Sequence, residues 1–446
     1  MRGYFISNGH LHLLVKNNNI SAWGNFPRII GKISKASTRE QLIKTLNEND
    51  TIIPFGNGRS YGDSALNDHM VQYDNPEIPI EFDQELGIVQ VSAATQIGDL
   101  IDYILPFGWF PPVVPGTKFV TIGGAIAADI HGKNHHIDGC FSQHVLSFNL
   151  MLADGDIIHC SKSNTPELFK ATCGGMGLTG IILNAKIKMM SVQSNIVEQI
   201  SYKAKNINQI FSLFQKNDSK RYSVAWIDCT AKENKLGRGI LITGDFIEQE
   251  YQSEINRPKK PGISIPFFLP SWIINKFSLK IFNTLYYNVS GLKEKKKINI
   301  DYNDFFFPLD TLHHWNRLYG RKGFLQYQFV LPLKYSFTGI QKILVKISQS
   351  GQGSPLAVLK LFGPENKNYL SFPMKGYTLA LDFKNQPSVF PLLNELDKIV
   401  LEYKGRVYLA KDARINKANF ESGYGKINNF RKLRHQDNLE TKFQSN

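Results

Sequence analysis

Residues 56–64 read GNGRSYGDS and follow a short apolar run, TIIPF, at residues 51–55. A second glycine-rich block starts with PGT at residues 115–117 and continues as TIGGAIAADIHGKNHH at residues 121–136. Glycines at this density let the backbone approach a ligand closely and turn its N–H groups toward it. Successive N–H groups of this kind form a nest for an anion, which suits a phosphate or a pyrophosphate.

The spacing of these glycines excludes two common phosphate-binding motifs. No Gly-Lys-Ser/Thr follows either block, so neither is a Walker loop. The Gly-x-Gly-x-x-Gly spacing that leads into a helix is also missing, so neither is a Rossmann fingerprint. Two separate loops that cradle one elongated dinucleotide are a different solution, and this arrangement points to FAD.

Together the blocks resemble the FAD-binding domain of the vanillyl-alcohol-oxidase class of flavoproteins. Within that class they are most similar to the decaprenylphosphoryl-β-D-ribose oxidase family, the flavin half of an epimerase that makes the arabinose donor of mycobacterial cell walls. The sharpest local match is HGKNHH at residues 131–136. Three later segments agree in the family's order, at residues 323–330, 360–364 and 410–414.

The resemblance implies an α+β fold with two domains, in which an antiparallel-sheet substrate domain covers the flavin. We expect an FAD-binding domain at residues 1–193, a substrate-binding domain at 194–405, and a C-terminal segment at 406–446 that returns to the first domain. Apolar spacing predicts helices at residues 38–46, 96–105 and 166–172, and alternation predicts strands at 87–93, 181–189, 222–228 and 239–243. A hairpin is expected at residues 148–159.

The resemblance also implies which residues hold the flavin, and it adds a third glycine cluster at residues 173–180. The expected cofactor-binding residues are Gly56, Asn57, Gly58, Arg59, Ser60, Tyr61, Gly62, Ser64, Pro115, Gly116, Thr117, Thr121, Gly123, Gly124, Ala127, Asp129, Ile130, His131, Gly177, Gly180, Ile181, Tyr408 and Lys411. Many members of the wider class bond the flavin covalently through a histidine in the first loop. Residues 58–61 read GRSY instead, so we expect noncovalent FAD.

Three residues match family positions where chemistry is expected. His131 and Lys133 lie beside flavin and substrate in the family, and a histidine can relay the proton of a substrate hydroxyl. Lys411 matches a lysine at the flavin, where a cation stabilises the reduced, anionic form. A structural histidine and an ion pair between Lys411 and Asp412 are the alternatives. The adjacent histidines lack carboxylate partners at ligand spacing, so no metal is expected.

Five residues are expected to bind the substrate. Gln326 and Gln328 point to one face of a strand, and two amides on one face are costly to bury unless they meet a polar ligand such as a sugar. Lys360 interrupts an apolar run, and the matching family lysine reaches the substrate's phosphate region. Trp226 and Tyr61 complete the set by resemblance. A solvent-exposed strand face for the glutamines and a core role for Trp226 stay open.

Three departures from the family pattern put the exact sugar in doubt. Ala380 replaces a cysteine that is a site of covalent inhibitor attack in mycobacterial members. Thr378 replaces an asparagine and Phe306 replaces a tyrosine.

Composition and charge narrow the function classes. The chain has 446 residues and a formal net charge of +14. Its basic clusters at 257–260 and 293–297 bracket an apolar segment, whereas nucleic-acid-binding proteins interleave such clusters with aromatics, so no nucleic-acid partner is expected. The four cysteines form no Cys-x-x-Cys pair and are expected to be buried, reduced thiols. With no signal peptide and no spanning apolar run, we expect a cytoplasmic protein, peripheral at the inner face of the plasma membrane.

The apolar segment at residues 261–292 leaves two interpretations open. Aromatic and aliphatic residues with basic edges suit a surface that touches anionic lipid without crossing it. Helical spacing of apolar residues equally suits a buried helix pair.

The resemblance implies FAD-dependent oxidation of a secondary hydroxyl of polyprenyl-phosphoryl-β-D-ribose to the 2-keto form. A nicotinamide-dependent keto-sugar reductase would then complete the epimerisation. An aldonolactone or free-sugar oxidase of the same fold is the alternative enzyme. A basic flavoprotein scaffold or nucleic-acid-binding protein without turnover is the alternative of another class.

Overall fold

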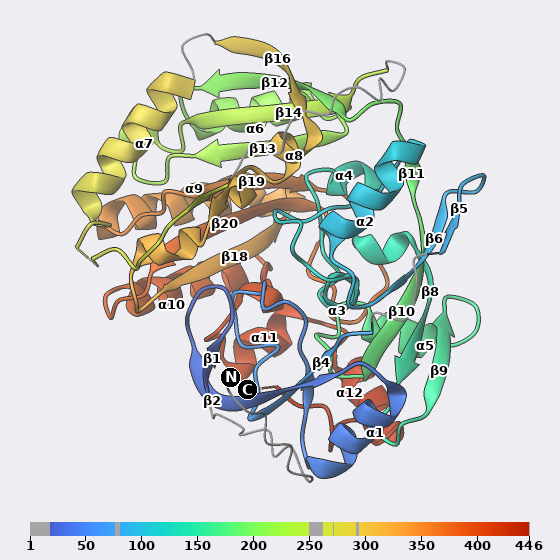
Figure 1. Ribbon diagram of the computed structural model, residues 1–446. Coiled ribbons are helices and arrows are strands. Elements are labelled where there is room, and N and C mark those ends of the chain that lie inside the picture. Colours follow the sequence, from blue (N-terminus) through green and yellow to red (C-terminus); the bar gives the residue numbers. More distant parts are fainter. Residues whose placement is uncertain (1–17, 76–80, 249–261, 271, 291–293, 446) are drawn as a thin grey trace, which may run out of the picture.

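The computed structural model describes residues 18–75, 81–248, 262–270, 272–290 and 294–445, and its strands form three main sheets (Figure 1). The first sheet has the order β1-β2-β4-β3, with parallel pairing of β2 and β3 to β4. Its strands are β1 (Asn18–Ser21), β2 (Arg28–Ala36), β3 (Ile53–Pro54) and β4 (His69–Tyr73). Helix α1 (Arg39–Glu48) starts where the Thr38 hydroxyl accepts a hydrogen bond from the Gln41 N–H.

The second sheet has the order β5-β6-β10-β8-β9 and is antiparallel. Its strands are β5 (Glu81–Asp83), β6 (Ile88–Ser92), β8 (Val145–Met151), β9 (Ile157–Ser161) and β10 (Ile181–Lys188). Its accompanying helices are α2 (Ile97–Ile104), α3 (Ile122–Ala127), α4 (His135–Asp138) and α5 (Pro166–Thr172). Strands β7 (Trp109–Phe110) and β11 (Met190–Ser191) form a separate pair. The first glycine block follows β3 of the first sheet, and the second block contains α3 and the first two residues of α4.

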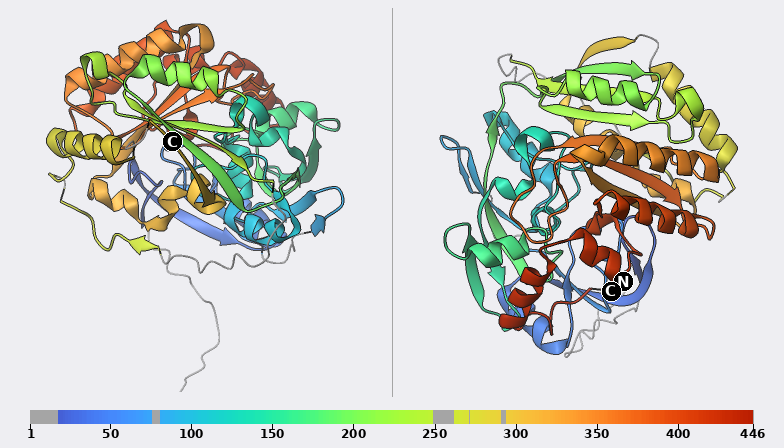
Figure 2. Two further views of the ribbon diagram at one scale, coloured as in Figure 1. Left: turned by 90° about the horizontal axis from the view of Figure 1, so that it is seen from above. Right: turned by 180° about the vertical axis from the view of Figure 1, so that it is seen from behind.

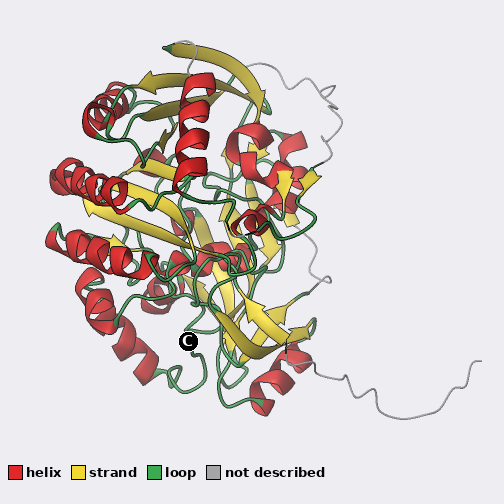
Figure 3. Ribbon diagram, turned by 90° about the vertical axis from the view of Figure 1, so that its left-hand side faces the viewer, coloured by secondary structure: helices red, strands yellow, loops and turns green. Residues whose placement is uncertain are grey.

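The third sheet is antiparallel and has the order β16-β12-β14-β13-β19-β20-β18-β21. Its strands are β12 (Ile196–Ala204), β13 (Tyr222–Ile227), β14 (Gly239–Phe246), β16 (Lys295–Asp301), β18 (Phe324–Pro332), β19 (Ala357–Phe362), β20 (Gly376–Lys384) and β21 (Arg406–Val407). Helices α6 (Ile207–Lys216), α9 (Leu333–Ser350) and α10 (Val389–Glu402) cover one face (Figure 2, right). In Figure 3, where helices are red and strands yellow, several helices lie along one side of the strands, toward the left of the view.

Two further helices frame the opposite face of the third sheet. The short helix α8 (Tyr302–Phe306) follows β16, and α7 (Lys276–Ser290) runs beside the ends of β12, β14 and β13 (Figure 1). Strands β15 (Ile263–Ser264) and β17 (Leu312–His313) form a short parallel pair.

The C-terminal segment packs on the part of the molecule that carries the glycine blocks. Helix α12 (Ile427–Gln436) contacts α5 through Phe430, and α11 (Lys417–Gly423) precedes it. Phe443 joins the core of the first two sheets and forms a bridge with Ile52. The domain limits 1–193, 194–405 and 406–446 stay a prediction.

Several local expectations are confirmed. The helices expected near residues 38, 96 and 166 are α1, α2 and α5, and the expected hairpin is formed by β8 and β9. The four cysteines are free and buried, as expected. None of the helices in the described ranges is long and apolar enough to cross a membrane.

Of the two interpretations left open for residues 261–292, the buried helix pair is wrong for the described part of that segment. A single helix, α7, lies there, and Phe277, Ile281, Leu285 and Val289 on it are exposed. Helical spacing alone cannot tell whether an apolar stripe faces the core or the outside.

Candidate active site

A cavity of about 1220 Å³ lies between the glycine blocks and the uncovered face of the third sheet. Typical small-molecule pockets measure ~300–1,000 Å³, so this one has room for a cofactor together with a substrate. Almost every residue expected from the sequence lines it, including His131, Lys133, Lys360 and Lys411. The two exceptions are Gly62 and Asp129, which are not among the lining residues.

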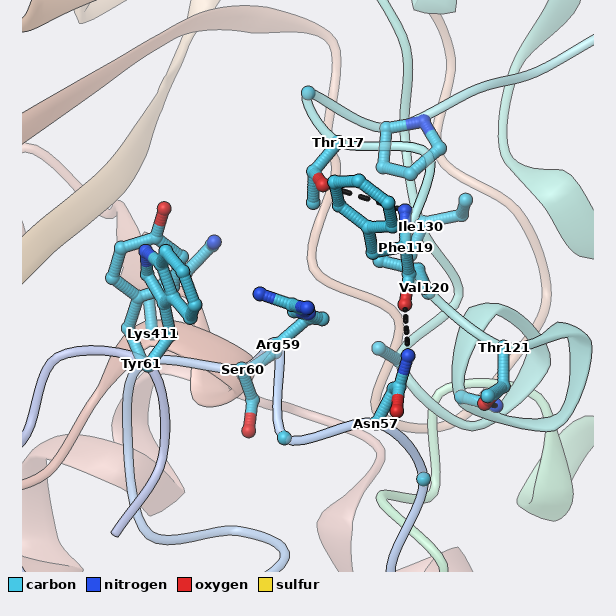
Figure 4. A pocket seen from close by; sticks show the side chains of 18 of the residues that line it. Asn57, Arg59, Ser60, Tyr61, Thr117, Phe119, Val120, Thr121, Ile130 and Lys411 are labelled. Carbon is cyan, nitrogen blue, oxygen red and sulfur yellow. Dashed lines mark hydrogen bonds between the residues drawn. The ribbon is translucent and has the colours of Figure 1, made fainter. Parts of the chain in front are cut away.

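The first glycine block forms the floor of this cavity (Figure 4). Asn57 ties it to the second block, because its amide donates to the Phe119 carbonyl at 3.0 Å. The Arg59 guanidinium stacks on the rings of Trp23 and Phe119, at 4.5 and 5.0 Å from their centroids. Its Nε is buried and has no hydrogen-bond partner among the described residues, so it is a donor that lacks an acceptor.

Gly62 explains how Lys411 comes to the first block. A Cβ on Gly62 would lie 1.5 Å from the Asp412 carbonyl oxygen, so only glycine allows the two segments to approach this closely. The Tyr61 N–H donates to the Ala410 carbonyl at 3.0 Å. As a result the Lys411 ammonium lies 3.6 Å from the centroid of the Tyr61 ring, and Figure 4 shows the two side chains side by side.

Asp129 anchors the loop that carries His131. This residue is fully buried, has a positive φ of 39°, and its carboxylate accepts four hydrogen bonds. The donors are the Ser142 N–H, the amides of Asn366 and Asn368, and the Ser371 hydroxyl. Asp129 therefore fixes the shape of the second block instead of facing the cavity.

His131 packs inside an aromatic cage and contacts Gln328. The rings of Phe362, Phe372 and Tyr408 lie 4.8, 5.6 and 5.2 Å from its own. Its Nε2 is 3.0 Å from the Gln328 amide nitrogen, and its Nδ1 is buried without a partner in the described part of the chain. Burial, together with the positive charge of Lys360, lowers the pKa of His131 well below its usual value.

The uncovered face of the third sheet supplies the opposite wall. Because strand side chains alternate, residues two apart share this face. The cavity-facing residues are Gln326 and Gln328 on β18, Thr378, Ala380 and Asp382 on β20, Val358 and Lys360 on β19, and Val224 and Trp226 on β13. The Trp226 ring contacts Tyr286 of α7 at 4.7 Å, and its N–H donates to the Pro355 carbonyl at 3.0 Å.

Three lysines enter the cavity from different elements. Burial lowers the pKa of Lys133 and of Lys411 to about 7, and that of Lys360 to about 8. The Lys133 ammonium donates to the Phe305 carbonyl and lies 4.4 Å from the centroid of the Phe305 ring. Three desolvated cations around one cavity favour an anionic occupant.

Comparison with known proteins agrees with this geometry. A family model described as an FAD binding domain matches residues 33–161. Decaprenylphosphoryl-β-D-ribose oxidase of Mycolicibacterium smegmatis is 35% identical over 431 residues, which cover 93% of this chain and 93% of the relative. The chain belongs to the decaprenylphosphoryl-β-D-ribose oxidase family. It is an FAD-dependent oxidoreductase with the α+β, two-domain FAD-binding fold expected from its glycine blocks.

Two other relatives are less similar to this chain. The human Δ(24)-sterol reductase is 23% identical over 321 residues, covering 70% of this chain and 56% of the reductase. The L-gulonolactone oxidase of Mus musculus is 28% identical over 158 residues, which cover 35% of each chain.

The cavity residues of this family member fit FAD. A Cβ on Gly116 would meet no atom within 4 Å, so this backbone faces open space that a flat ring system can fill. The unpaired Nε of Arg59 and the backbone of residues 56–60 suit a diphosphate, as charge-assisted donors to phosphate oxygens. When bound, FAD accepts a hydride from the substrate carbon.

Reading the sequence missed two acidic residues of this site. Asp382 lies on the cavity face of β20, and Asp310 accepts a hydrogen bond from the Lys118 N–H at 2.8 Å near the first block. A signal for Asp382 was present, because it stands in an apolar strand two residues after Ala380 and shares its face.

Proposed function

We propose that this protein oxidises a secondary hydroxyl of a sugar carried on a polyprenyl phosphate. The substrate we expect is polyprenyl-phosphoryl-β-D-ribose, and the product is its 2-keto form. The observation that carries the proposal is the patch of Gln328, Gln326 and Lys360, two amides and a cation, on the sheet face that looks into a large cavity. The name of the M. smegmatis relative supports the same substrate class.

Each wall of the cavity receives a role in this proposal. Gln326 and Gln328 hold the sugar, and Lys360 binds the substrate phosphate. The negative charge of the phosphate offsets the cost of burying a cation in an apolar strand. Lys411 supports negative charge on the reduced cofactor from its place beside Tyr61. Lys133 and Trp226 shape the substrate end near α8 and α7.

The cofactor is held noncovalently in this proposal. Residues 56–64, which approach the cofactor, contain neither histidine nor cysteine. Acid denaturation of the purified protein should therefore release all yellow colour into the supernatant. Flavin that stays with the precipitated chain would contradict this.

A separate protein completes the epimerisation. Oxidation leaves a keto sugar, and reduction from the opposite face needs a hydride from a second source, for which we propose a nicotinamide-dependent reductase. Adding such a reductase with its cofactor should convert the keto product into the arabinose isomer. Return of only the ribose isomer would argue against an epimerase.

Helix α7 gives this protein a surface for anionic lipid. Exposed Phe277, Ile281, Leu285 and Val289 repeat every four residues along one side, and Lys276 and Lys280 lie among them. The other side is fixed by Asn283, whose amide donates to Asp228 at 3.0 Å. A fixed helix that presents apolar and basic side chains outward suits the interface of a bilayer.

The same helix also lines the cavity. Phe282 and Tyr286 line the cavity, and Tyr286 contacts Trp226 inside it. A polyprenyl chain that remains in the lipid could therefore present its sugar phosphate along α7. The proposed membrane contact and the proposed path of the substrate thus both involve α7.

Vesicle flotation tests this contact. The wild type should float with vesicles that contain anionic phosphatidylglycerol, and less with phosphatidylcholine alone. Replacing Phe277, Ile281 and Leu285 together by serine should abolish flotation, whereas serine at Ile30, Leu86 and Ile137, which are also exposed but lie elsewhere, should not. Equal flotation of both triple variants would remove α7 as the contact.

The deciding experiment for the activity is an anaerobic titration of the flavin spectrum. Bleaching by polyprenyl-phosphoryl ribose, and not by free sugars or aldonolactones, would support the proposal. Bleaching by aldonolactones or free sugars alone would favour the alternative oxidase. A protein that no substrate bleaches but that binds DNA or RNA in a salt-sensitive way would belong to the other class.

A further inference from the structure

Asp382 is a buried carboxylate to which the proposed function has so far given no task. It lies on β20 opposite Gln326 of β18, and its side chain is 1% exposed. One oxygen, Oδ1, accepts a hydrogen bond from the Gln326 amide at 2.6 Å. The other, Oδ2, is buried and has no donor among the described residues, although Asp382 lines the cavity. A carboxylate oxygen left without a donor is costly, so this atom is placed for a ligand group.

The groups around Asp382 come from three other elements. Lys411 follows β21, Tyr61 belongs to the first glycine block, and Tyr319 lies in the short helix at Trp315–Tyr319. Burial raises the pKa of Asp382 to about 7, and burial lowers that of Lys411 to about 7. Burial raises the pKa of both tyrosines well above the ordinary value, so they stay neutral near pH 7.

The hydrogen bonds around His131 argue against its acting as the proton acceptor. The Thr378 hydroxyl donates to the Phe329 carbonyl at 2.8 Å, so its oxygen accepts from the Gln328 amide nitrogen at 3.3 Å. This fixes the amide so that its N–H₂ group also points to His131 Nε2. The lone pair of Nε2 is thereby engaged and the ring proton lies on Nδ1. His131 Nδ1 is then a donor, a different role from the proton relay expected from the sequence.

We propose that Asp382 accepts the proton of the substrate hydroxyl. This role rests on the proposed function. The substrate C–H bond breaks, and the hydrogen leaves with the electron pair of that bond as a hydride. The flavin is the oxidant that would accept this hydride. The O–H bond breaks as the proton passes to Asp382 Oδ2, and the carbon–oxygen double bond forms. The positive charge of Lys411 favours the ionised form of this carboxylate before the transfer.

The direct test compares Asp382→Asn with the wild type in anaerobic stopped-flow reduction by polyprenyl-phosphoryl ribose. An asparagine keeps an oxygen for the Gln326 amide and nearly the same shape, so the fold and the flavin content should be unchanged. General-base catalysis typically contributes ~10²–10⁴-fold, so we expect flavin reduction at saturating substrate to slow by about 100-fold or more. Asp156→Asn, at an exposed hairpin turn, is the matched control and should reduce at the wild-type rate.

The pH dependence separates this role from a structural one. Asp382 must be ionised to accept a proton, so the wild-type rate of flavin reduction should rise with pH on the acid side of about 7. On the alkaline side it should fall again, because Lys411 loses its positive charge there. The rise should disappear in Asp382→Asn, persist in His131→Asn at a lower overall rate, and return in part in Asp382→Glu. A second readout is infrared: reduction by substrate should produce a protonated-carboxyl band that Asp382→Asn lacks.

Three results would overturn the assignment. They are an unchanged rate and pH profile in Asp382→Asn, loss of the rise in His131→Asn instead, and a missing carboxyl band in the wild type. Failure of the proposed function looks different, because then no sugar substrate bleaches the wild-type flavin and the role of Asp382 falls with it.

Discussion

The two faces of the third sheet are built by the same strands and yet differ in every respect that matters for function. On the face under α6, α9 and α10, alternate residues such as Phe329, Leu359 and Leu379 are fully buried hydrophobics. On the cavity face, their immediate neighbours are Gln328, Lys360 and Ala380. Adjacent residues of one strand can therefore serve different purposes, because successive side chains point to opposite sides of the sheet. One packs in the core and stabilises the fold, and the next lines the cavity.

This comparison predicts opposite outcomes for adjacent residues of β20, and the effect should be the largest of those we expect. Leu379→Ala removes a fully buried core side chain and should lower the free energy of unfolding by ~2–5 kcal/mol. Ala380→Leu adds a side chain to the cavity and should leave stability nearly unchanged while it blocks flavin reduction by substrate. Chemical denaturation of both proteins, with a stopped-flow assay on each, checks the pair. Similar destabilisation by both would mean that the cavity face is packed as a core.

Lys411→Met should weaken catalysis without weakening the fold. Loss of a preorganised charge at a reaction centre typically costs ~10²–10³-fold in rate, so flavin reduction should slow by about 100-fold. The flavin midpoint potential should become more negative, because a cation beside the cofactor favours its reduced, anionic form. The matched control is Lys346→Met, which removes an exposed lysine on α9 that pairs with Glu395. An unchanged potential in Lys411→Met would separate this lysine from the cofactor.

Local sequence was enough to predict the parts of the site that lie close together in the chain. The glycine blocks, and the spacing of Gln326 and Gln328, gave the cofactor class and the wall of the cavity, because close approach and strand alternation are properties of neighbouring residues. The contact of Lys411 with Tyr61 was beyond reach, since it depends on Gly62 meeting Asp412 across 350 positions. The outward direction of the apolar side of α7 could not be predicted either, because it depends on the hydrogen bond between Asn283 and Asp228.

The buried lysines should also make the apoprotein sensitive to pH. Lys360 has a pKa of about 8 in the folded protein, below the ordinary value near ~10.4 that it has when unfolded. Between these values the unfolded chain binds more protons, so stability should rise as pH increases from about 8 to about 10. Lys360→Met should be more stable than the wild type at pH 7, and the gap should narrow at pH 10. Thermal denaturation of both apoproteins, with Lys346→Met as the control, measures this, and parallel curves would contradict it.

The smallest effect we expect concerns two buried threonines whose hydroxyls have different hydrogen-bond partners. Thr378 donates to the Phe329 carbonyl and accepts from Gln328, whereas the hydroxyl of Thr243 on β14 has no partner among the described residues. Thr378→Val should cost about 1 kcal/mol of stability, while Thr243→Val should be neutral or stabilising, since it buries no unpaired oxygen. Thr378→Val should also raise KM for the sugar a few-fold, because Gln328 loses the partner that orients its amide. Equal effects of the two substitutions, measured by urea denaturation and steady-state kinetics, would show that the Thr378 hydroxyl does not hold Gln328 in place.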